Sequence, residues 1–232
     1  MNLEKLSIPL AIIVAGVLIA GSLYYSNIKT AKELAKVKSL GDVEPAEIEM
    51  RPVSSSDHIL GNPDADVIIV EYSDTECPFC KQFHSTLRRV IEEYGKEGRV
   101  AWVYRHFPID SLHPKARKES EALECANELG GPEKFWEYTN TLYEVTNSND
   151  SLDPAELPKI AKTIGLDVKT FNTCLSSGKY ADKIEADYQD AVKAGGRGTP
   201  NSILVTKDGL KTTVRGAESY ESLKAILDAL LN

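Results

Sequence analysis

Two cysteines in the tetrapeptide Cys77-Pro78-Phe79-Cys80 have the spacing and the position of a reversible redox pair. The mostly apolar run Val67–Tyr72 before them predicts a strand, and Lys81–Tyr94 after them predicts a helix. Cys77 would lie at the helix N-terminus, where unpaired N–H groups and the helix dipole favour its thiolate. The thiolate is the attacking species in disulfide exchange, and Cys80 lies one turn further on. The pattern therefore predicts thiol–disulfide chemistry.

The same spacing also occurs in zinc sites. A structural zinc site would need a second close pair of cysteines or a Cys/His group at ligand spacing. The other cysteines, Cys125 and Cys174, are single and distant, and His84 and His106 form no such group. An iron–sulfur cluster is disfavoured for the same reason. We therefore expect no metal and no cofactor.

Two further positions would serve a redox pair. Glu71 lies towards the end of the predicted strand, where a partly buried carboxyl would have a raised pKa and could exchange protons with Cys80. The alternative is an edge residue that faces water. Thr199-Pro200 ends a glycine-rich loop and leads into a strand. A cis proline there would present the Thr199 backbone to a substrate beside the thiols, whereas a trans proline would only start an edge strand.

Cys125 and Cys174 both lie in helical patterns, far apart in the sequence. A disulfide between them would close a loop of about fifty residues and stabilise the fold by roughly 4 kcal/mol on the chain-entropy model. Such bonds persist only in oxidising compartments. The alternative is two unrelated buried thiols that act as small hydrophobic residues.

The N-terminal residues predict export. No charge interrupts the chain between Lys5 and Lys29, and Ile8–Tyr25 is almost wholly apolar, which approaches the length of a membrane-spanning helix. We expect a membrane anchor over residues 1–28, although Ala20-Gly21-Ser22 would also suit cleavage of a signal peptide and a secreted form. Lysines after the run would favour a cytoplasmic domain by the positive-inside rule. Large domains translocate largely regardless of charge, so we place the domain outside.

The remaining chain reads as one α/β domain of ordinary hydrophobic content behind a linker. Its formal net charge of −8 argues against nucleic acid as a partner. Two prolines, several acids and three serines predict a flexible linker over residues 29–57, so the folded domain would span residues 58–232. A strand over 99–106 completes a strand–helix–strand unit with parallel pairing. Helical patterns fill an insertion at about 113–194, with a break at Gly130-Gly131 between the first two helices. We expect Phe135, Trp136 and Tyr138 to form the core of this insertion rather than a ligand cage. Two strands, at 201–206 and 211–215, and a final helix at 219–231 follow the insertion.

In this order of elements the chain resembles the DsbA-like thiol:disulfide oxidoreductases of the thioredoxin superfamily. The resemblance runs from about His58 to the C-terminus. It is carried by these motifs: Glu71-Tyr72-Ser73-Asp74, Cys77-Pro78-Phe79-Cys80, Tyr104-Arg105-His106-Phe107-Pro108, Lys134-Phe135-Trp136 and Gly198-Thr199-Pro200.

The resemblance implies a thioredoxin-like fold with an inserted all-helical domain and a cis Pro200. It also implies that Glu71 serves the active-site thiols and that Cys125 and Cys174 form a second, non-catalytic disulfide. Clients would bind at the residues that flank the thiols, namely Pro78, Phe79, Thr199 and Pro200.

The resemblance implies disulfide formation in cysteine-containing exported proteins, with a quinone-linked membrane partner for reoxidation. One departure matters. The best-known oxidases of the family have His where this chain has Phe79, which removes one stabiliser of the Cys77 thiolate. We therefore expect a weaker oxidant. A disulfide isomerase or reductase, or a membrane-tethered chaperone-like binding module, remains an alternative.

Overall fold

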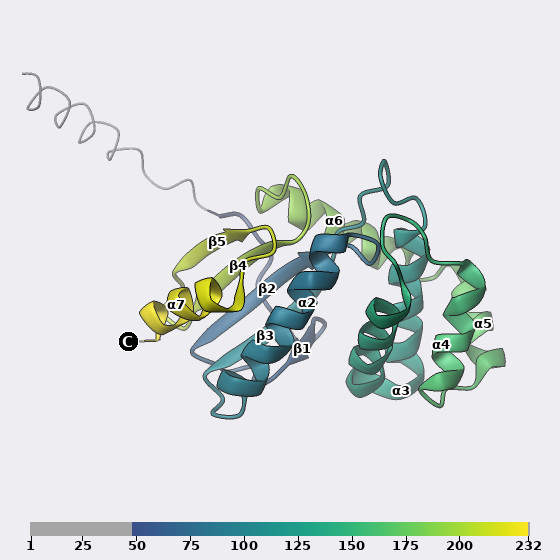
Figure 1. Ribbon diagram of the computed structural model, residues 1–232, viewed down its shortest axis with the longest axis horizontal. Helices are drawn as coiled ribbons and strands as arrows, with labels where there is room; N and C mark the ends of the chain where they lie inside the picture. Colours follow the sequence, from purple (N-terminus) through teal and green to yellow (C-terminus); the bar gives the residue numbers. More distant parts are fainter. Residues whose placement is uncertain (1–47, 232) are drawn as a thin grey trace, which may run out of the picture. The chain divides into compact units, whose positions relative to one another are not determined.

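The structure, a computed structural model, describes residues 48–231 (Figure 1). These residues contain a five-stranded sheet with the strand order β1-β3-β2-β4-β5. The strands are β1 (His58–Leu60), β2 (Val67–Ser73), β3 (Val100–His106), β4 (Asn201–Thr206) and β5 (Lys211–Arg215). The short edge strand β1 was not expected from the sequence, because three residues carry no alternation that a pattern could show.

Strand β2 is the centre of the sheet. It pairs in parallel with β3 and antiparallel with β4, so that Ile69 lies between Trp102 and Leu204. The connection from β2 to β3 is helix α2 (Pro78–Val90) followed by the π-helical turn η1 (Ile91–Gly95). The predicted strand–helix–strand unit with parallel pairing is thereby confirmed. A central strand covered on both faces explains the nearly continuous apolar run of β2.

The two faces of β2 pack against different helices. Val67 and Ile69 belong to a core with α2 and the C-terminal helix α7 (Tyr220–Leu230), which lie on the near face of the sheet in Figure 1. Val70 and Tyr72 point to the other face, into a smaller core that includes α6 (Ala181–Lys193). Successive strand residues alternate between faces, so a single strand holds both layers of helices.

The helical insertion between β3 and β4 begins with the longest helix, α3 (Ala116–Val145). Gly131 interrupts this helix with a φ of 74° and is followed by Pro132, which matches the predicted break between two helices. The turn η2 (Pro154–Glu156), α4 (Leu157–Thr163) and α5 (Val168–Ser177) complete the bundle before α6. As predicted, its aromatic side chains form core, with the following three buried: Phe135, Trp136 and Tyr138.

A disulfide joins Cys125 of α3 to Cys174 of α5. The two residues are 49 positions apart, and their Cα atoms lie 5.9 Å from one another. Closing a loop of this length removes chain entropy from the unfolded state, a stabilisation of about 4 kcal/mol on the chain-entropy model. The bond therefore holds the insertion together and leaves Cys77 and Cys80 as the free thiols of the described residues.

Residues 48–57 pack against the domain, although the sequence assigned them to the linker. Arg105, fully buried on β3, binds the Asp57 carboxylate through Nε at 2.8 Å and the Asp190 carboxylate through Nη1 at 2.7 Å. Arg51 also pairs with Asp57, at 2.7 Å. These partners are distant in sequence, so no local pattern reveals them. Within the described residues, the packed part of the chain thus extends back to Ile48, ahead of the expected boundary.

The expected membrane anchor over residues 1–28, and most of the expected linker, lie outside the described residues. Within residues 48–231, no helix has both the length and the apolar character needed to span a bilayer.

Candidate active site

Cys77 and Cys80 lie at the start of α2, where the sequence placed them. Cys77 is the N-cap residue with an extended backbone, and Pro78 occupies the first turn, where its missing N–H leaves no hydrogen bond unmade. Cys80 is fully buried, whereas Cys77 keeps 5% of its surface exposed. Phe79 between them is 59% exposed. Cys77 is therefore the sulfur that a client can reach.

The two thiols have opposite pKa shifts. A hydrogen bond with Cys80 lowers the pKa of Cys77 to about 6 against the opposing effect of burial, with further help from the Thr199 side chain and from backbone N–H groups of the first helical turn. Burial raises the pKa of Cys80 well above its usual value, and the adjacent Cys77 raises it further. Near neutral pH, Cys77 is mainly a thiolate and Cys80 a thiol. Because of this difference in pKa, Cys77 is the sulfur that takes part in exchange with clients and the one that leaves as a thiolate when the product is released.

The Thr199–Pro200 peptide bond is cis and lies beside Cys77. The Cys77 Sγ is 3.4 Å from the carbonyl oxygen of Thr199, within hydrogen-bonding distance for a thiol. Strand β4 starts at the next residue, Asn201, which pairs with Tyr72 near the end of β2. The sheet therefore holds the proline loop and the start of α2 side by side, although 122 residues separate Cys77 from Thr199.

Glu71 is fully buried, on the face of β2 that α2 covers. Ser73 Oγ donates to its Oε1 at 2.9 Å, and Trp102 Nε1 donates to its Oε2 at 3.0 Å. Burial raises the pKa of Glu71 to about 8; the two hydrogen bonds oppose this, and the charge of Cys77 adds to it. Glu71 therefore carries a proton at neutral pH. The hydrogen bonds of Ser73 and Trp102 to Glu71 were not predicted from the sequence, and only the sheet register brings Trp102 to this carboxyl.

Glu71→Gln is expected to make the stability of the reduced protein less sensitive to a rise in pH from about 4.5 to about 8. In the wild type, the unfolded chain releases the Glu71 proton near pH 4.5, while the folded chain keeps it up to about pH 8. The folded state binds more protons over this range, so wild-type stability declines as pH rises. Urea unfolding between pH 4 and pH 9 should show the variant gaining stability relative to the wild type. The exposed control Glu97→Gln should not, and parallel profiles for Glu71→Gln would contradict the assignment.

The loop between β2 and α2 is held by contacts that the sequence did not predict. Asp74 donates its backbone N–H to Cys80 Sγ at 3.4 Å, and its carboxylate accepts from the Glu76 backbone N–H and from His113 Nδ1. The Glu76 carboxylate in turn accepts from the backbone N–H of Leu152 at 2.9 Å. These contacts fix the loop to the helical insertion. Asp74 belongs to one of the motifs that carry the resemblance, but the signals in the sequence that mark Glu76 are limited to its position next to Cys77.

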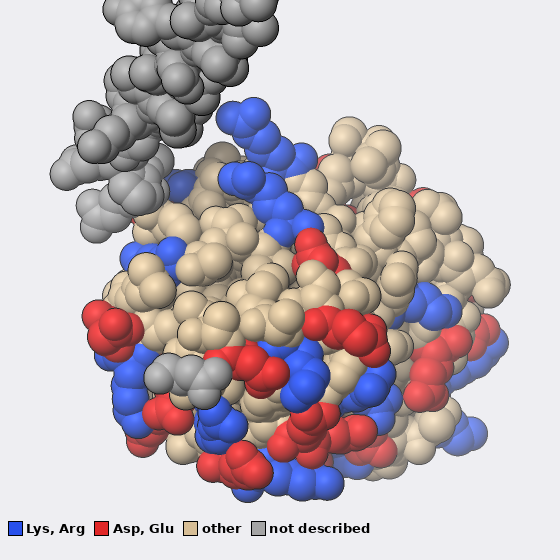
Figure 2. All heavy atoms as spheres, turned by 60° about the vertical axis from the view of Figure 1, so that its left-hand side comes forward, with Lys and Arg blue, Asp and Glu red and all other residues tan. Residues whose placement is uncertain are grey.

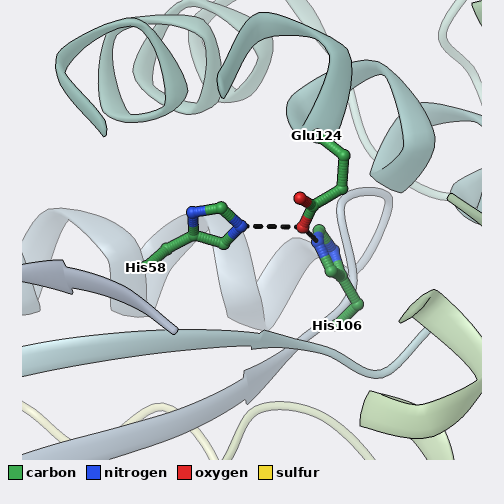
Figure 3. Close-up of side chains that lie close together, drawn as sticks. All are labelled: His58, His106 and Glu124. Atoms are coloured by element: carbon green, nitrogen blue, oxygen red, sulfur yellow. Dashed lines mark hydrogen bonds and ion pairs between the residues drawn. The ribbon is translucent and has the colours of Figure 1, made fainter. Parts of the chain in front are cut away.

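A buried cluster of His58, His106 and Glu124 has the residue types of a metal site (Figure 3). Both histidines point their Nε2 atoms at one oxygen, Glu124 Oε1, at 2.7 and 2.8 Å. Lys183 Nζ lies 3.1 Å from the same oxygen. Burial alone would raise the pKa of Glu124, but the hydrogen bonds from the two histidines hold it below its usual range. The Lys183 ammonium group at this oxygen would compete with a metal cation. The cluster is therefore better explained as a structural link that joins β1 and β3 to α3.

Comparisons with known proteins agree with the fold described above. A family model described as thioredoxin matches residues 54–229. Among solved structures, DsbA2 from Pseudomonas aeruginosa is 25% identical, with a TM-score of 0.66 over 78% of this chain and 97% of that one. BdbD from Bacillus subtilis is 23% identical, with a TM-score of 0.67 over 79% and 97% of the two chains. The latter likeness shows the fold alone.

Curated relatives include much longer proteins. The Na(+)/H(+) antiporter NhaA 3 of Salinispora tropica is 35% identical over 148 residues, which cover 64% of this chain and 21% of the antiporter. The Na(+)/H(+) antiporter NhaA 1 of Mycolicibacterium gilvum is 32% identical over 169 residues, covering 71% and 26%. The chain thus spans about a fifth to a quarter of the length of these relatives.

Proposed function

The chain belongs to the DsbA-like thiol:disulfide oxidoreductases of the thioredoxin superfamily, and from this premise we propose that it introduces disulfides into exported proteins. The observation that carries the proposal is the asymmetry of the pair, with an accessible Cys77 of low pKa and a buried Cys80 of high pKa. A stabilised Cys77 thiolate favours the reduced pair, so the oxidised pair readily accepts electrons from clients. The matches to the antiporters do not support a transport function for this chain, since they cover only 21% and 26% of the antiporter sequences.

The reaction proceeds in two exchanges. A client thiolate attacks Cys77 Sγ of the Cys77–Cys80 disulfide, the bond between the two cysteines breaks, and its electron pair stays on Cys80. The buried Cys80 thiolate then takes a proton, for which protonated Glu71 is the nearby source. A second client thiolate attacks the client sulfur of the mixed disulfide, and Cys77 leaves as the stabilised thiolate. The client gains a disulfide and the protein keeps two electrons.

The location of the reaction and its partners are part of the proposal. An apolar run over residues 8–25 supports a membrane anchor and an extracytoplasmic domain, or a secreted form after cleavage. The disulfide between Cys125 and Cys174 supports an oxidising compartment, where such bonds persist. Reoxidation of Cys77 and Cys80 would need a membrane-bound, quinone-linked partner.

The direction of the reaction is tested by equilibrating the full-length chain with a glutathione series and by following oxidation of a two-cysteine peptide. We expect a reduction potential between about −270 mV and about −120 mV, the values of thioredoxin and DsbA, because Phe79 supplies no side-chain donor to the thiolate. Oxidised protein should convert reduced peptide to its disulfide. A potential near that of thioredoxin, with the pair mostly reduced in cells, would favour a reductase or isomerase instead.

A further inference from the structure

A hollow of about 690 Å³ adjoins the proline loop. Thr199 and Pro200 form one part of its wall, and Gly195, Gly198 and Gly216 leave open space where side chains would otherwise project. Because Cys77 Sγ lies 3.4 Å from the Thr199 carbonyl oxygen, a client cysteine bonded to Cys77 sits at the edge of this hollow. Client residues next to that cysteine therefore come within reach of the groups that line the hollow.

Two arginines give the hollow its charge. Arg197 lies in the glycine-rich loop, and Arg215 ends β5 opposite Asn201 in the register of the sheet. A hydrogen bond from Gly216 N to the Pro200 carbonyl oxygen, at 2.9 Å, fixes the end of β5 to the proline loop. Both arginine side chains are exposed, and neither pairs with a carboxylate within the described part of the chain.

No acidic residue lines the hollow, and a third polar group there lacks a partner. Asn201 is 2% exposed, and its Nδ2 makes no hydrogen bond. The lower part of the face in Figure 2 mixes acidic and basic side chains, whereas in its upper part basic side chains protrude and acidic ones are few. As far as the structure describes the chain, the hollow thus combines two unpaired arginines with no acidic residue, in a protein whose formal net charge is −8.

We propose that Arg197 and Arg215 select clients that carry a carboxylate close to the reacting cysteine. This inference rests on the proposed function and names its substrate class. Phe79, which is exposed and carries no charge, can contact apolar client residues but cannot select for charge, so charge selection would depend on the two arginines. Complementary charges at a solvent-exposed site act mainly on association, and salt screens them.

The test uses three two-cysteine peptides that differ in one residue beside a cysteine, which is Glu, Gln or Lys. An adjacent carboxylate changes the reactivity of the peptide thiol itself, so each rate is divided by that of the same peptide with neutral hydroxyethyl disulfide. For the oxidised full-length chain at low salt, we expect kcat/KM to fall in the order Glu, Gln, Lys, with a ratio of Glu to Gln of about fivefold. High salt should bring this ratio towards one.

The double variant Arg197→Gln/Arg215→Gln should lose the preference while oxidising the Gln peptide at close to the wild-type rate, which also shows that it is folded. The matched control Lys207→Gln removes an exposed positive charge outside the hollow and should keep the preference. The inference would be overturned by equal rates for the Glu and Gln peptides in the wild type, or by a preference that survives in the double variant. Either result would leave the proposed function standing. Failure to oxidise any peptide would overturn the proposed function and the inference with it.

Discussion

Cys77→Ser is expected to reduce peptide oxidation to the uncatalysed rate, the largest effect on activity that the structure predicts. Cys77 is the accessible sulfur and the one whose pKa is lowered to about 6, so both the attack by the client and the release of the product pass through it. A serine hydroxyl cannot form a disulfide with Cys80. The measurement is turnover of a two-cysteine peptide in a glutathione buffer.

Cys80→Ala is the matched comparison, because it removes the other sulfur and leaves Cys77 in place. In this variant Cys77 cannot form the disulfide with Cys80, but its thiolate still exchanges with disulfides of clients or of glutathione, and no neighbouring thiol can reverse the mixed disulfide by attacking Cys77 Sγ. Mixed disulfides with clients should therefore accumulate and appear on non-reducing gels. The fully buried position of Cys80 explains why it cannot replace Cys77 in meeting clients. Full activity of the Cys80 variant would rule out the two-cysteine scheme.

Arg105→Met is expected to destabilise the fold by about 3 to 5 kcal/mol, the range for breaking a buried charge pair by removing one partner. The guanidinium has no exposure and binds the carboxylates of Asp57 and Asp190. Burial raises the pKa of Asp57, but hydrogen bonds and charge from Arg105 outweigh it and lower the pKa to about 2. Without Arg105, a buried negative charge would remain poorly compensated.

Urea unfolding at neutral pH measures this loss, with Arg99→Met as the control, since Arg99 is partly exposed and lies 3.8 Å from its partner Glu97. The pH dependence gives a second readout. The lowered pKa of Asp57 stabilises the wild type above about pH 4, and this contribution is lost as pH falls towards 2. The stability of the Arg105 variant should not show this loss as pH falls. A variant as stable as the control would show that the buried network contributes little.

The sequence predicted the elements whose formation depends on local signals. The apolar run of β2, the proline in the first turn of α2 and the Gly131-Pro132 break in α3 act on neighbouring residues, so they can be read without the fold. The cis proline stood as one of two readings of Thr199-Pro200, and the resemblance favoured it. Here the order of motifs along the chain carried more information than the spacing of any pair.

What the sequence did not reveal depends on pairing across long distances. Asp57 belongs to a segment that looks like linker, yet it is held by Arg105, 48 residues away. His58 and Glu124 meet across 66 residues, and the hydrogen bond from Trp102 to Glu71 exists only because β3 lies in register beside β2. A charged or aromatic residue looks the same in sequence whether it is solvated or buried against such a partner, so these roles appear only once the sheet is assembled.

The unequal acidities of Cys77 and Cys80 also determine how many protons accompany the two electrons. Above about pH 6 the reduced pair holds one proton, on Cys80, whereas in more acidic surroundings it holds two. A tenfold change in a two-electron equilibrium equals about 30 mV, so the driving force should drift by about 30 mV per pH unit in the first range and about twice that in the second. The oxidising strength of the pair should therefore depend least on pH on the alkaline side of that boundary.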